Sequence, residues 1–292
     1  MRNLFTQKSC LLVLLVLAAI GNADDDWLLP WQEATVMIVA GPNPLHNESG
    51  TNIQIGRKAN ATGFLVEARE ELNLPPLLIT CKHVPDSLVS RYGAIYIYFF
   101  DPETKSIFRD GCIFCPIAET PPGYFCFDTY DLAAFIIDTC NVIGDHRVLD
   151  LIKPFDFSNT RLIDNLNHGD GMALLGYPGS ILRAYPWTER PMLRIGSISW
   201  ILNDNGPPQE YLVDIETYPG YSGSPIVFIQ EYSPNMINPE PVSFAGIQSS
   251  AIVYDDSLSV LSGNTGLATV VPSDIVILLS ELVFASILDE ND

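Results

Sequence analysis

A serine between two glycines is the residue of this sequence best placed for nucleophilic chemistry. Ser222 lies in the motif PGYSGSP at residues 219–225, and the apolar run IVF follows at once. Glycine neighbours leave a hydroxyl accessible, and backbone N–H groups of a tight turn can point at a developing oxyanion. Similar short sequences occur in ordinary loops between strands. The motif therefore indicates catalysis only if a base and an acid are found elsewhere in the chain. Ser224 is the alternative nucleophile in the same motif.

A serine hydroxyl is a poor nucleophile at neutral pH and requires a histidine base, which a carboxylate must orient. The chain has four histidines. His83 follows the apolar run LLIT, at the end of an expected strand. The other three lie in polar loop contexts: His46, His146 and His168. We therefore expect His83 to be the base.

The carboxylate expected to orient this base is Asp131. It opens the stretch DLAAFII, which has the pattern of a buried strand. A carboxylate that abuts such a strand should be desolvated, and a desolvated charge needs a partner. Asp128 and Asp138 are the competing acids near the same stretch.

Three blocks of this sequence resemble the trypsin-like peptidases, especially the bacterial-type branch that contains high-temperature-requirement proteases and glutamyl endopeptidases. The blocks are TCKH at residues 80–83, DLA at 131–133 and GYSGSP at 220–225, in the order of the family. The separations are 48 residues from His83 to Asp131 and 91 from Asp131 to Ser222. Chymotrypsin-type enzymes have about 45 and about 90. Weaker similarities extend the resemblance over about residues 34–280: TGFLV at 62–66, GYP at 176–178, GI at 246–247 and VPS at 271–273.

The resemblance implies an all-β fold of two six-stranded antiparallel β-barrels with a C-terminal helix, and an active site between the barrels. It implies a serine endopeptidase in which Ser222 attacks the scissile carbonyl, His83 transfers the proton and Asp131 orients the imidazole. The backbone N–H groups of Gly220 and Ser222 would form the oxyanion hole. Ser224 is disfavoured, because the nucleophile of the family precedes the second glycine.

By the same resemblance, substrate-binding residues are expected at Glu216, Thr217 and Gln248. Glutamyl endopeptidases carry a threonine that Thr217 matches, together with a histidine. Gln248 stands at the position of that histidine, which argues against glutamate specificity. Glu216 either faces the pocket and favours lysine or arginine by charge pairing, or is a solvated loop acid.

Two departures from the family pattern keep a second class of function open. Cys81 and Lys82 replace the usual pair of alanines before the histidine. Tyr221 stands just before the nucleophile, where the family often has Asn, Asp or Gln. Neither change removes a catalytic group. The alternative is a catalytically inactive homologue that acts as a peptide-binding module.

Short apolar runs rich in Val, Ile, Phe and Tyr, separated by turn-forming residues, predict strands through most of the chain. The expected strands span residues 34–40, 62–68, 77–80, 94–100, 132–137, 171–175, 192–201, 211–215, 225–229, 244–249 and 267–271. One helix is expected at about 273–287, with Ser273 as its N-cap and Asp274 in its first turn. Residues 153–170 should connect two halves, at about 34–152 and 171–272, of one peptidase domain at 24–292.

Residues 1–23 predict a cleaved secretory signal. Arg2 and Lys8 precede an apolar run that is shorter than the roughly 20 residues needed to span a bilayer, and the small residues GNA follow. We therefore expect a secreted protein, or a periplasmic one in a Gram-negative host, without membrane association after cleavage. The net charge of the whole chain is −20. This acidity disfavours nucleic acid, because phosphate binding needs clustered Lys and Arg. The expected partners are protein or peptide substrates, with no cofactor and no metal.

Five cysteines remain after the expected signal: Cys81, Cys112, Cys115, Cys126 and Cys140. In an oxidising compartment they predict two disulfides and one free thiol, with the pairing left open. Cys112 and Cys115 form a CxxC motif without a second such motif or paired histidines, so a structural disulfide within residues 112–140 is expected rather than a zinc or redox site. Asn47 and Asn60 match the acceptor pattern for N-glycosylation.

Overall fold

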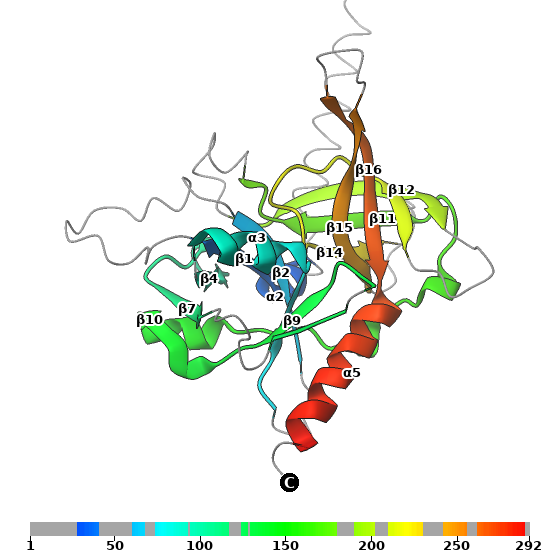
Figure 1. The fold of residues 1–292 in the computed structure, drawn as a ribbon. Helices are drawn as coiled ribbons and strands as arrows, with labels where there is room; N and C mark the ends of the chain where they lie inside the picture. Colours follow the sequence, from blue (N-terminus) through cyan, green and yellow to red (C-terminus); the bar gives the residue numbers. More distant parts are fainter. Residues whose placement is uncertain are drawn as a thin grey trace, which may run out of the picture.

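Antiparallel strands in two groups, followed by one long helix, are the main elements of the part of the chain that the structure describes (Figure 1). The structure is a computed structural model, and it describes residues 28–40, 60–67, 74–92, 94–116, 124–127, 129–179, 190–201, 210–229, 242–255 and 262–289. The expected signal at residues 1–23 and the acceptor Asn47 lie outside these residues. Asn60 is the first residue of a strand.

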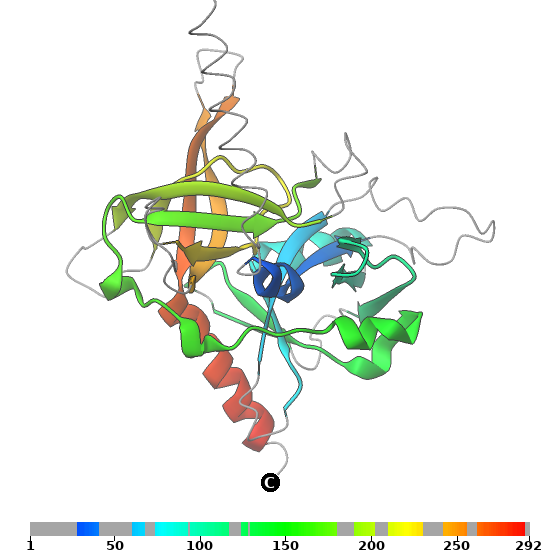
Figure 2. The ribbon, with the colours of Figure 1, turned by 180° about the vertical axis from the view of Figure 1, so that it is seen from behind.

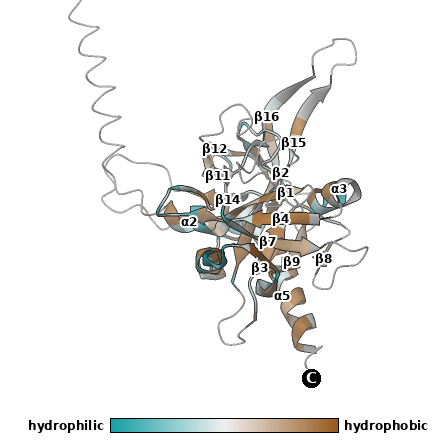
Figure 3. Cartoon of the chain, turned by 90° about the vertical axis from the view of Figure 1, so that its left-hand side faces the viewer, coloured by the Kyte–Doolittle hydropathy of each residue, from teal (hydrophilic) through white to brown (hydrophobic). Residues whose placement is uncertain are grey.

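The N-terminal group is an eight-stranded sheet in the order β10-β7-β4-β1-β2-β3-β9-β8. Its strands are β1 (Thr35–Ala40), β2 (Asn60–Val66), β3 (Leu77–Thr80), β4 (Ala94–Tyr98), β7 (Gly111–Pro116), β8 (Tyr124–Cys126), β9 (Ala133–Ile136) and β10 (Val142–Gly144). A separate two-stranded ladder joins β5 (Phe100–Asp101) to β6 (Ser106–Ile107). Every residue of β1 and β3 is buried, so these strands lie within the core. Figure 3 shows the apolar colour concentrated on the central strands.

The C-terminal group is a closed six-stranded barrel in the order β11-β12-β13-β16-β15-β14. Its strands are β11 (Gly171–Gly176), β12 (Met192–Ile201), β13 (Tyr211–Asp214), β14 (Pro225–Phe228), β15 (Ser243–Asp255) and β16 (Ser262–Pro272). Closure removes free strand edges from the barrel itself. β15 and β16 continue past the barrel as a two-stranded ribbon (Figure 1).

The expected all-β, two-part fold with a C-terminal helix is confirmed, and all eleven expected strands are present. The N-terminal half departs from the expected six-stranded barrel, because β7, β8 and β10 extend its sheet to eight strands. The sequence pattern did not predict these three strands, nor β5 and β6. Four of the five have only two or three residues, and β7 contains Gly111 and Pro116 at its ends, so each carries a weak strand signal.

The described residues contain three α-helices, of which only the last was predicted from sequence: α2 (Leu29–Ala34), α3 (His83–Tyr92) and α5 (Ser273–Asp289). Short 3₁₀ turns lie at Thr139–Asn141, His146–Leu151, Phe157–Asn159 and Ile163–Asn165. α3 has Pro85 and Asp86 in its first turn, both typical of helix starts, but only ten residues in which to show a period. No helix within the described ranges has the length and apolarity needed to cross a membrane.

α5 is tied at its N-terminus to the segment that connects the two halves. The Ser273 hydroxyl donates to the carbonyl oxygen of Arg161 at 2.8 Å. The Asp274 carboxylate accepts from the backbone N–H of Ile163 at 2.9 Å. The prediction that Ser273 caps its own helix is therefore wrong. Its hydroxyl bonds the connector instead of a backbone group of α5. Figure 2 shows this connector running between the two halves beside the start of α5.

Four aromatic rings from different elements pack together where the two halves meet. Phe64 of β2 stacks on Phe244 of β15 with ring centroids 5.2 Å apart. Phe155 of the connector lies 4.4 Å from Trp31 of α2 and 6.0 Å from Phe244. Aromatic pairs at such separations add stabilisation beyond the area they bury. We call these four residues the aromatic junction, and it links both halves to the connector.

The expected disulfide within residues 112–140 is absent from the described part of the chain, where all five cysteines are free thiols. Cys112 and Cys115 lie three positions apart on β7, and side chains at an odd separation on a strand point to opposite faces. Cys112 accordingly packs in a cluster with Met37 and Tyr98, whereas Cys115 packs in the main core. The CxxC motif cannot bring its two sulfur atoms together in this strand.

Candidate active site

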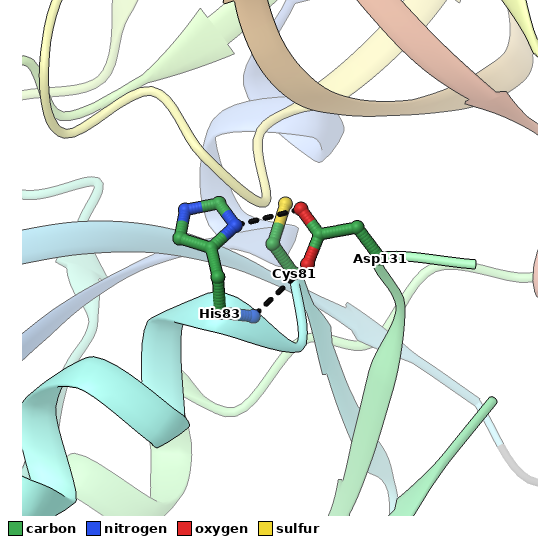
Figure 4. A group of neighbouring side chains, drawn as sticks. All are labelled: Cys81, His83 and Asp131. Atoms are coloured by element: carbon green, nitrogen blue, oxygen red, sulfur yellow. Dashed lines mark hydrogen bonds and ion pairs between the residues drawn. The ribbon is translucent and has the colours of Figure 1, made fainter. Parts of the chain in front are cut away.

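One carboxylate holds the candidate base at two points. Asp131 Oδ1 accepts the backbone N–H of His83 at 2.9 Å, and Asp131 Oδ2 lies 2.6 Å from His83 Nδ1 (Figure 4). Strand pairing explains why His83 and Asp131 lie close together, because Thr80 at the end of β3 pairs with Ala133 at the start of β9. His83 follows β3 and Asp131 precedes β9, so the register places both residues at the same edge.

The Asp131 carboxylate is ionised. Burial acts to raise its pKa, but the hydrogen bonds from the His83 ring and backbone outweigh that effect, and the pKa of Asp131 is lowered. The Glu210 carboxyl has a raised pKa, because it is partly buried and feels the charge of Asp131. Burial also raises the pKa of the Cys81 thiol well above its usual range, and the Asp131 charge adds to the effect. Cys81 is therefore a neutral thiol next to an ionised carboxylate.

The loop that carries Ser222 packs against the strand that leads to His83. The carbonyl oxygen of Ser222 accepts from the backbone N–H of Thr62 at 3.1 Å. Gly223 has a φ of 86°, and a Cβ there would meet the Thr62 carbonyl oxygen and the Thr80 hydroxyl at 2.2 Å each. Only glycine fits such a close approach with a positive φ. The structure thus places residues 222 and 223 beside Thr80, three positions before His83.

The last contact of the expected triad is a hydrogen bond between Ser222 and His83. Between described residues, the Ser222 hydroxyl makes no side-chain hydrogen bond, so this contact stays a prediction. In enzymes without substrate such catalytic hydrogen bonds are often long or poorly aligned, and they tighten in the complex. The His83 side chain is 49% exposed, so the ring is accessible from the solvent.

Thr62 holds the loop that carries Ser222 through its side-chain hydroxyl, a role that the sequence did not reveal. Its buried hydroxyl donates to the carbonyl oxygen of Gly220 at 2.7 Å and accepts from the backbone N–H of Tyr177 at 2.9 Å. The hydroxyl of Thr80 donates to the carbonyl oxygen of Thr62 at 2.8 Å. One side chain of the N-terminal half therefore joins two segments of the C-terminal barrel. The similarity of TGFLV to a family strand was the one available signal.

The backbone N–H groups of Gly220 and Ser222, the two expected oxyanion donors, bond no backbone acceptor within the described residues. The backbone N–H of Tyr221 donates to Tyr218 at 3.1 Å and that of Ser224 donates to Tyr221 at 2.8 Å, whereas those of Gly220 and Ser222 make no such bond. Gly220 has a φ of 110°, which turns the chain into this loop. No backbone hydrogen bond of the described loop therefore opposes the predicted oxyanion hole.

Tyr221 points into the barrel and away from the nucleophile. Its side chain is fully buried and belongs to the barrel core together with Leu174, Ile215 and Ile226. Gly176 makes room for it, because a Cβ at residue 176 would lie 2.7 Å from the ring. The bulky residue before Ser222 therefore anchors the loop and does not cover the active site.

The three expected substrate-binding residues lie in different environments. The Glu216 side chain is 56% exposed, lies 3.5 Å from the Arg194 guanidinium and accepts a hydrogen bond from the Tyr218 hydroxyl. Thr217 and Gln248 are each 2% exposed. The Gln248 amide oxygen has no hydrogen-bond partner among the described residues, whereas its backbone pairs with Ser224 and Gly223. Arg194 thus offsets the charge of Glu216, and Gln248 presents a buried acceptor behind the nucleophile loop.

A closed six-stranded barrel beside an eight-stranded sheet, with one C-terminal helix, is consistent with the trypsin-like fold that the sequence resemblance implies. No family model matches the sequence, and no curated protein matches it. Among solved structures, the chain is similar to the MamO protease domain from Magnetospirillum magneticum, with a TM-score of 0.48 and 14% identity, over 85% of this chain and 96% of that one.

Two further solved structures are similar to most of this chain. The HtrA-type protease AlgW, with a decapeptide, has a TM-score of 0.49 and 14% identity, over 89% of this chain and 66% of that one. A serine endoprotease from Yersinia pestis has a TM-score of 0.49 and 13% identity, over 89% and 65%. This chain spans about two thirds of the length of these two proteins. At these TM-scores and identities the likeness carries no argument about this chain, so a function must be inferred from the side chains of the site.

Proposed function

We propose that this protein is a serine endopeptidase that hydrolyses peptide bonds through Ser222, His83 and Asp131. The observation that carries the proposal is the pair of contacts from the Asp131 carboxylate to the backbone N–H and to Nδ1 of His83. A carboxylate that binds Nδ1 selects the tautomer in which Nε2 is the free base, and its charge stabilises the imidazolium that forms on proton transfer. The second contact, to the His83 backbone N–H, positions this residue at the N-terminus of α3.

The proposed reaction uses only groups of this chain and water. Ser222 Oγ attacks the scissile carbonyl carbon while His83 Nε2 takes the hydroxyl proton. The backbone N–H groups of Gly220 and Ser222 stabilise the oxyanion. His83 then gives the proton to the leaving amine, and an ester to Ser222 remains. Water, activated by the same imidazole, hydrolyses this acyl-enzyme and regenerates the hydroxyl.

Labelling with a fluorophosphonate probe tests the nucleophile. Wild-type protein should be labelled, and Ser222→Ala and His83→Ala should not be. Ser224→Ala is the matched control, because Ser224 lies in the same loop with a buried hydroxyl that has no described partner. It should label like the wild type. An unlabelled wild type, or equal labelling of Ser222→Ala, would contradict the proposal.

Substrate preference is proposed from the buried amide of Gln248 and the paired charge of Glu216. An acceptor without a donor favours a substrate side chain that can donate a hydrogen bond, and it disfavours a carboxylate. We expect a cleavage profile on a peptide library to be poor in glutamate before the scissile bond. Strong cleavage after glutamate would exclude this assignment of the pocket.

The second candidate is a peptide-binding module without catalysis. The missing contact between Ser222 and His83 and the replacement of two alanines by Cys81 and Lys82 favour it. Turnover of casein that disappears in His83→Ala would exclude it. Peptide binding that is equal in the wild type and His83→Ala, with no turnover, would support it.

Secretion is also a proposal, supported by the pattern of residues 1–23. After expression in an exporting host, the recovered chain should begin at Asp24. Its mass should fall on treatment with a glycosidase if Asn47 or Asn60 is modified in a eukaryotic host. Retention of residues 1–23 on the recovered protein would argue against the signal.

A further inference from the structure

A thiol lies against the candidate base and its carboxylate. Cys81 follows β3 directly and precedes His83 by two residues. One ligand atom from each of Cys81, His83 and Asp131 lies within 4.8 Å of the other two, which makes them a potential metal-binding group (Figure 4). The family that the sequence resembles usually has alanine at the position of Cys81, so this sulfur is a departure from the pattern.

We propose that Cys81, His83 and Asp131 form an inhibitory binding site for a thiophilic divalent cation, with Zn²⁺ or Cd²⁺ as the ions that fit. Thiolate, imidazole and carboxylate are the three protein ligands that zinc prefers. A water molecule would complete a four-coordinate shell. The consequence for catalysis rests on the proposed peptidase function, but the binding itself does not.

The three groups lie near enough to one another to share one ion after small side-chain movements. Zinc lies about 2.0–2.3 Å from such ligands, which implies separations between ligand atoms of about 3.3–3.8 Å. His83 Nδ1 and Asp131 Oδ2 are 2.6 Å apart, so the carboxylate must withdraw slightly from the ring. The three groups already lie within 4.8 Å, so the remaining adjustment is one of side chains.

Access and charge favour a cation at this position. The Cys81 side chain is fully buried, whereas the side chains of His83 and Asp131 are 49% and 29% exposed. An ion can therefore arrive from the solvent side and reach the sulfur below. The negative charge of Asp131, which is felt as far as the Glu210 carboxyl, attracts a cation.

Binding exchanges a proton for the ion. In the metal-free protein the Cys81 thiol donates to the carbonyl oxygen of Gln248, with a sulfur–oxygen distance of 3.1 Å. On coordination the thiol proton leaves to solvent, the sulfur–hydrogen bond is replaced by a sulfur–metal bond, and the Gln248 carbonyl keeps the bond from the Gly223 N–H. No oxidant or reductant is needed.

Inhibition follows from the tautomer of His83. Catalysis needs the proton on Nδ1, facing Asp131, so that Nε2 can accept the proton of Ser222. A metal ion on Nδ1 leaves the remaining ring proton on Nε2, where the imidazole cannot act as a base. The bound ion also removes Asp131 from its role in stabilising the imidazolium.

Cadmium binding to the purified full-length protein tests the site without any assay of activity. The absorption of a cadmium–thiolate bond should appear on titration and saturate at one ion per chain. Cys81→Ser should lose this absorption, with Cys81→Ala as the second variant if serine is not tolerated. Cys140→Ser is the matched control, since Cys140 is the exposed cysteine outside the site, and it should behave like the wild type.

Ser222→Ala separates this inference from the proposed function. That variant should bind cadmium as the wild type does, whether or not the wild type is an active peptidase. No saturable absorption in the wild type, or an absorption that survives in Cys81→Ser, would overturn the proposal. Loss of the absorption only in Cys140→Ser would overturn it as well.

The functional arm measures fluorophosphonate labelling during a zinc titration, with each variant compared with its own metal-free rate. Zinc should slow the labelling of the wild type, and a chelator should restore it. In Cys81→Ser the half-inhibitory concentration should rise at least about tenfold, the lower end of the affinity loss seen when a metal site loses even a supporting residue. An unchanged half-inhibitory concentration would overturn the inhibitory role.

Discussion

At the scale of single residues, the two oxygens of Asp131 have separate tasks. Oδ1 holds the backbone of His83, and Oδ2 faces the ring. The first contact positions the helix start, and in the proposed mechanism the second selects the tautomer of the ring. Replacing the carboxylate by an amide separates them, because an amide of the same shape can keep the position while it presents the wrong hydrogen-bonding group to Nδ1.

Asp131→Asn should lower kcat by about 10⁴-fold with little change in fold, because the imidazole would lose its oriented tautomer. Kinetics on a peptide substrate and a circular dichroism spectrum would check both parts. A variant that keeps more than about a tenth of the wild-type kcat would contradict the assigned role.

The same substitution predicts a dependence of stability on pH. The folded-state pKa of Asp131 is lowered, so its contribution to the free energy of unfolding is present above its unfolded pKa of about 3.9. That contribution is lost as the pH falls through the folded-state value. The stability difference between wild type and Asp131→Asn in urea should therefore be larger at pH 7 than at pH 3. An equal difference at both pH values would contradict the ionised assignment.

Thr62 is the residue whose hydroxyl joins the two halves beneath the nucleophile loop. Thr62→Val keeps the shape but leaves the Gly220 carbonyl and the Tyr177 N–H without this partner. The free energy of unfolding should fall by about 1–3 kcal/mol. The rate of probe labelling should fall by about 10²-fold, because a small shift of the loop misplaces the nucleophile. Thr62→Ser keeps the hydroxyl and should restore most of both values.

At the scale of elements, strand register determines which residues meet. The pairing of Thr80 with Ala133 brings the end of β3 to the start of β9, and α3 begins where β3 has ended. The connector is positioned in a comparable way, by backbone groups that the first residues of α5 bind. A helix at the end of the chain therefore fixes a segment more than 100 residues earlier.

Ser273→Ala should lower the free energy of unfolding by about 1–3 kcal/mol, because Ser273 is fully buried and the Arg161 carbonyl would lose its donor. Chemical unfolding in urea would measure the loss. Ser286→Ala is the control on the same helix, since that hydroxyl donates only to the preceding turn, at Val283. A loss as large in the control would mean that the effect belongs to the helix and not to its attachment.

At the scale of the whole molecule, the site lies where an open sheet meets a closed barrel. The proposed base and its carboxylate lie at the ends of strands of the sheet, and the loop of the proposed nucleophile belongs to the barrel. The aromatic junction of Trp31, Phe64, Phe155 and Phe244 holds these parts together. Any loosening of that junction should separate the nucleophile from the base.

Phe244→Ala should cost about 3–5 kcal/mol of stability, the usual loss for a fully buried phenylalanine, and should also slow probe labelling in the folded fraction. Phe244→Leu retains most of the apolar volume and should lose less of both. Urea unfolding monitored by tryptophan fluorescence would report the first quantity. Labelling that is unaffected at full folding would show that the junction does not position the active site.

Much of the strand content could be predicted, because alternating apolar runs between turn residues identify strands locally. β3 and β12 have the predicted bounds. The short strands β8 and β10 were missed, since three residues cannot display a period. His83 and Asp131 were identified from their positions at strand ends, and the structure brings them into contact.

Residue types, their order and their spacing are enough to predict a base, a carboxylate and a nucleophile in this chain, because each has a local signature beside a strand. Only the tertiary structure decided that Cys112 and Cys115 face apart, that Tyr221 turns into the barrel, that Thr62 binds the loop of Ser222, and that Cys81 lies beside Asp131. These outcomes depend on contacts between residues far apart in sequence. Such contacts follow from strand register and from the packing of the two halves, and neither leaves a mark on a local stretch of sequence.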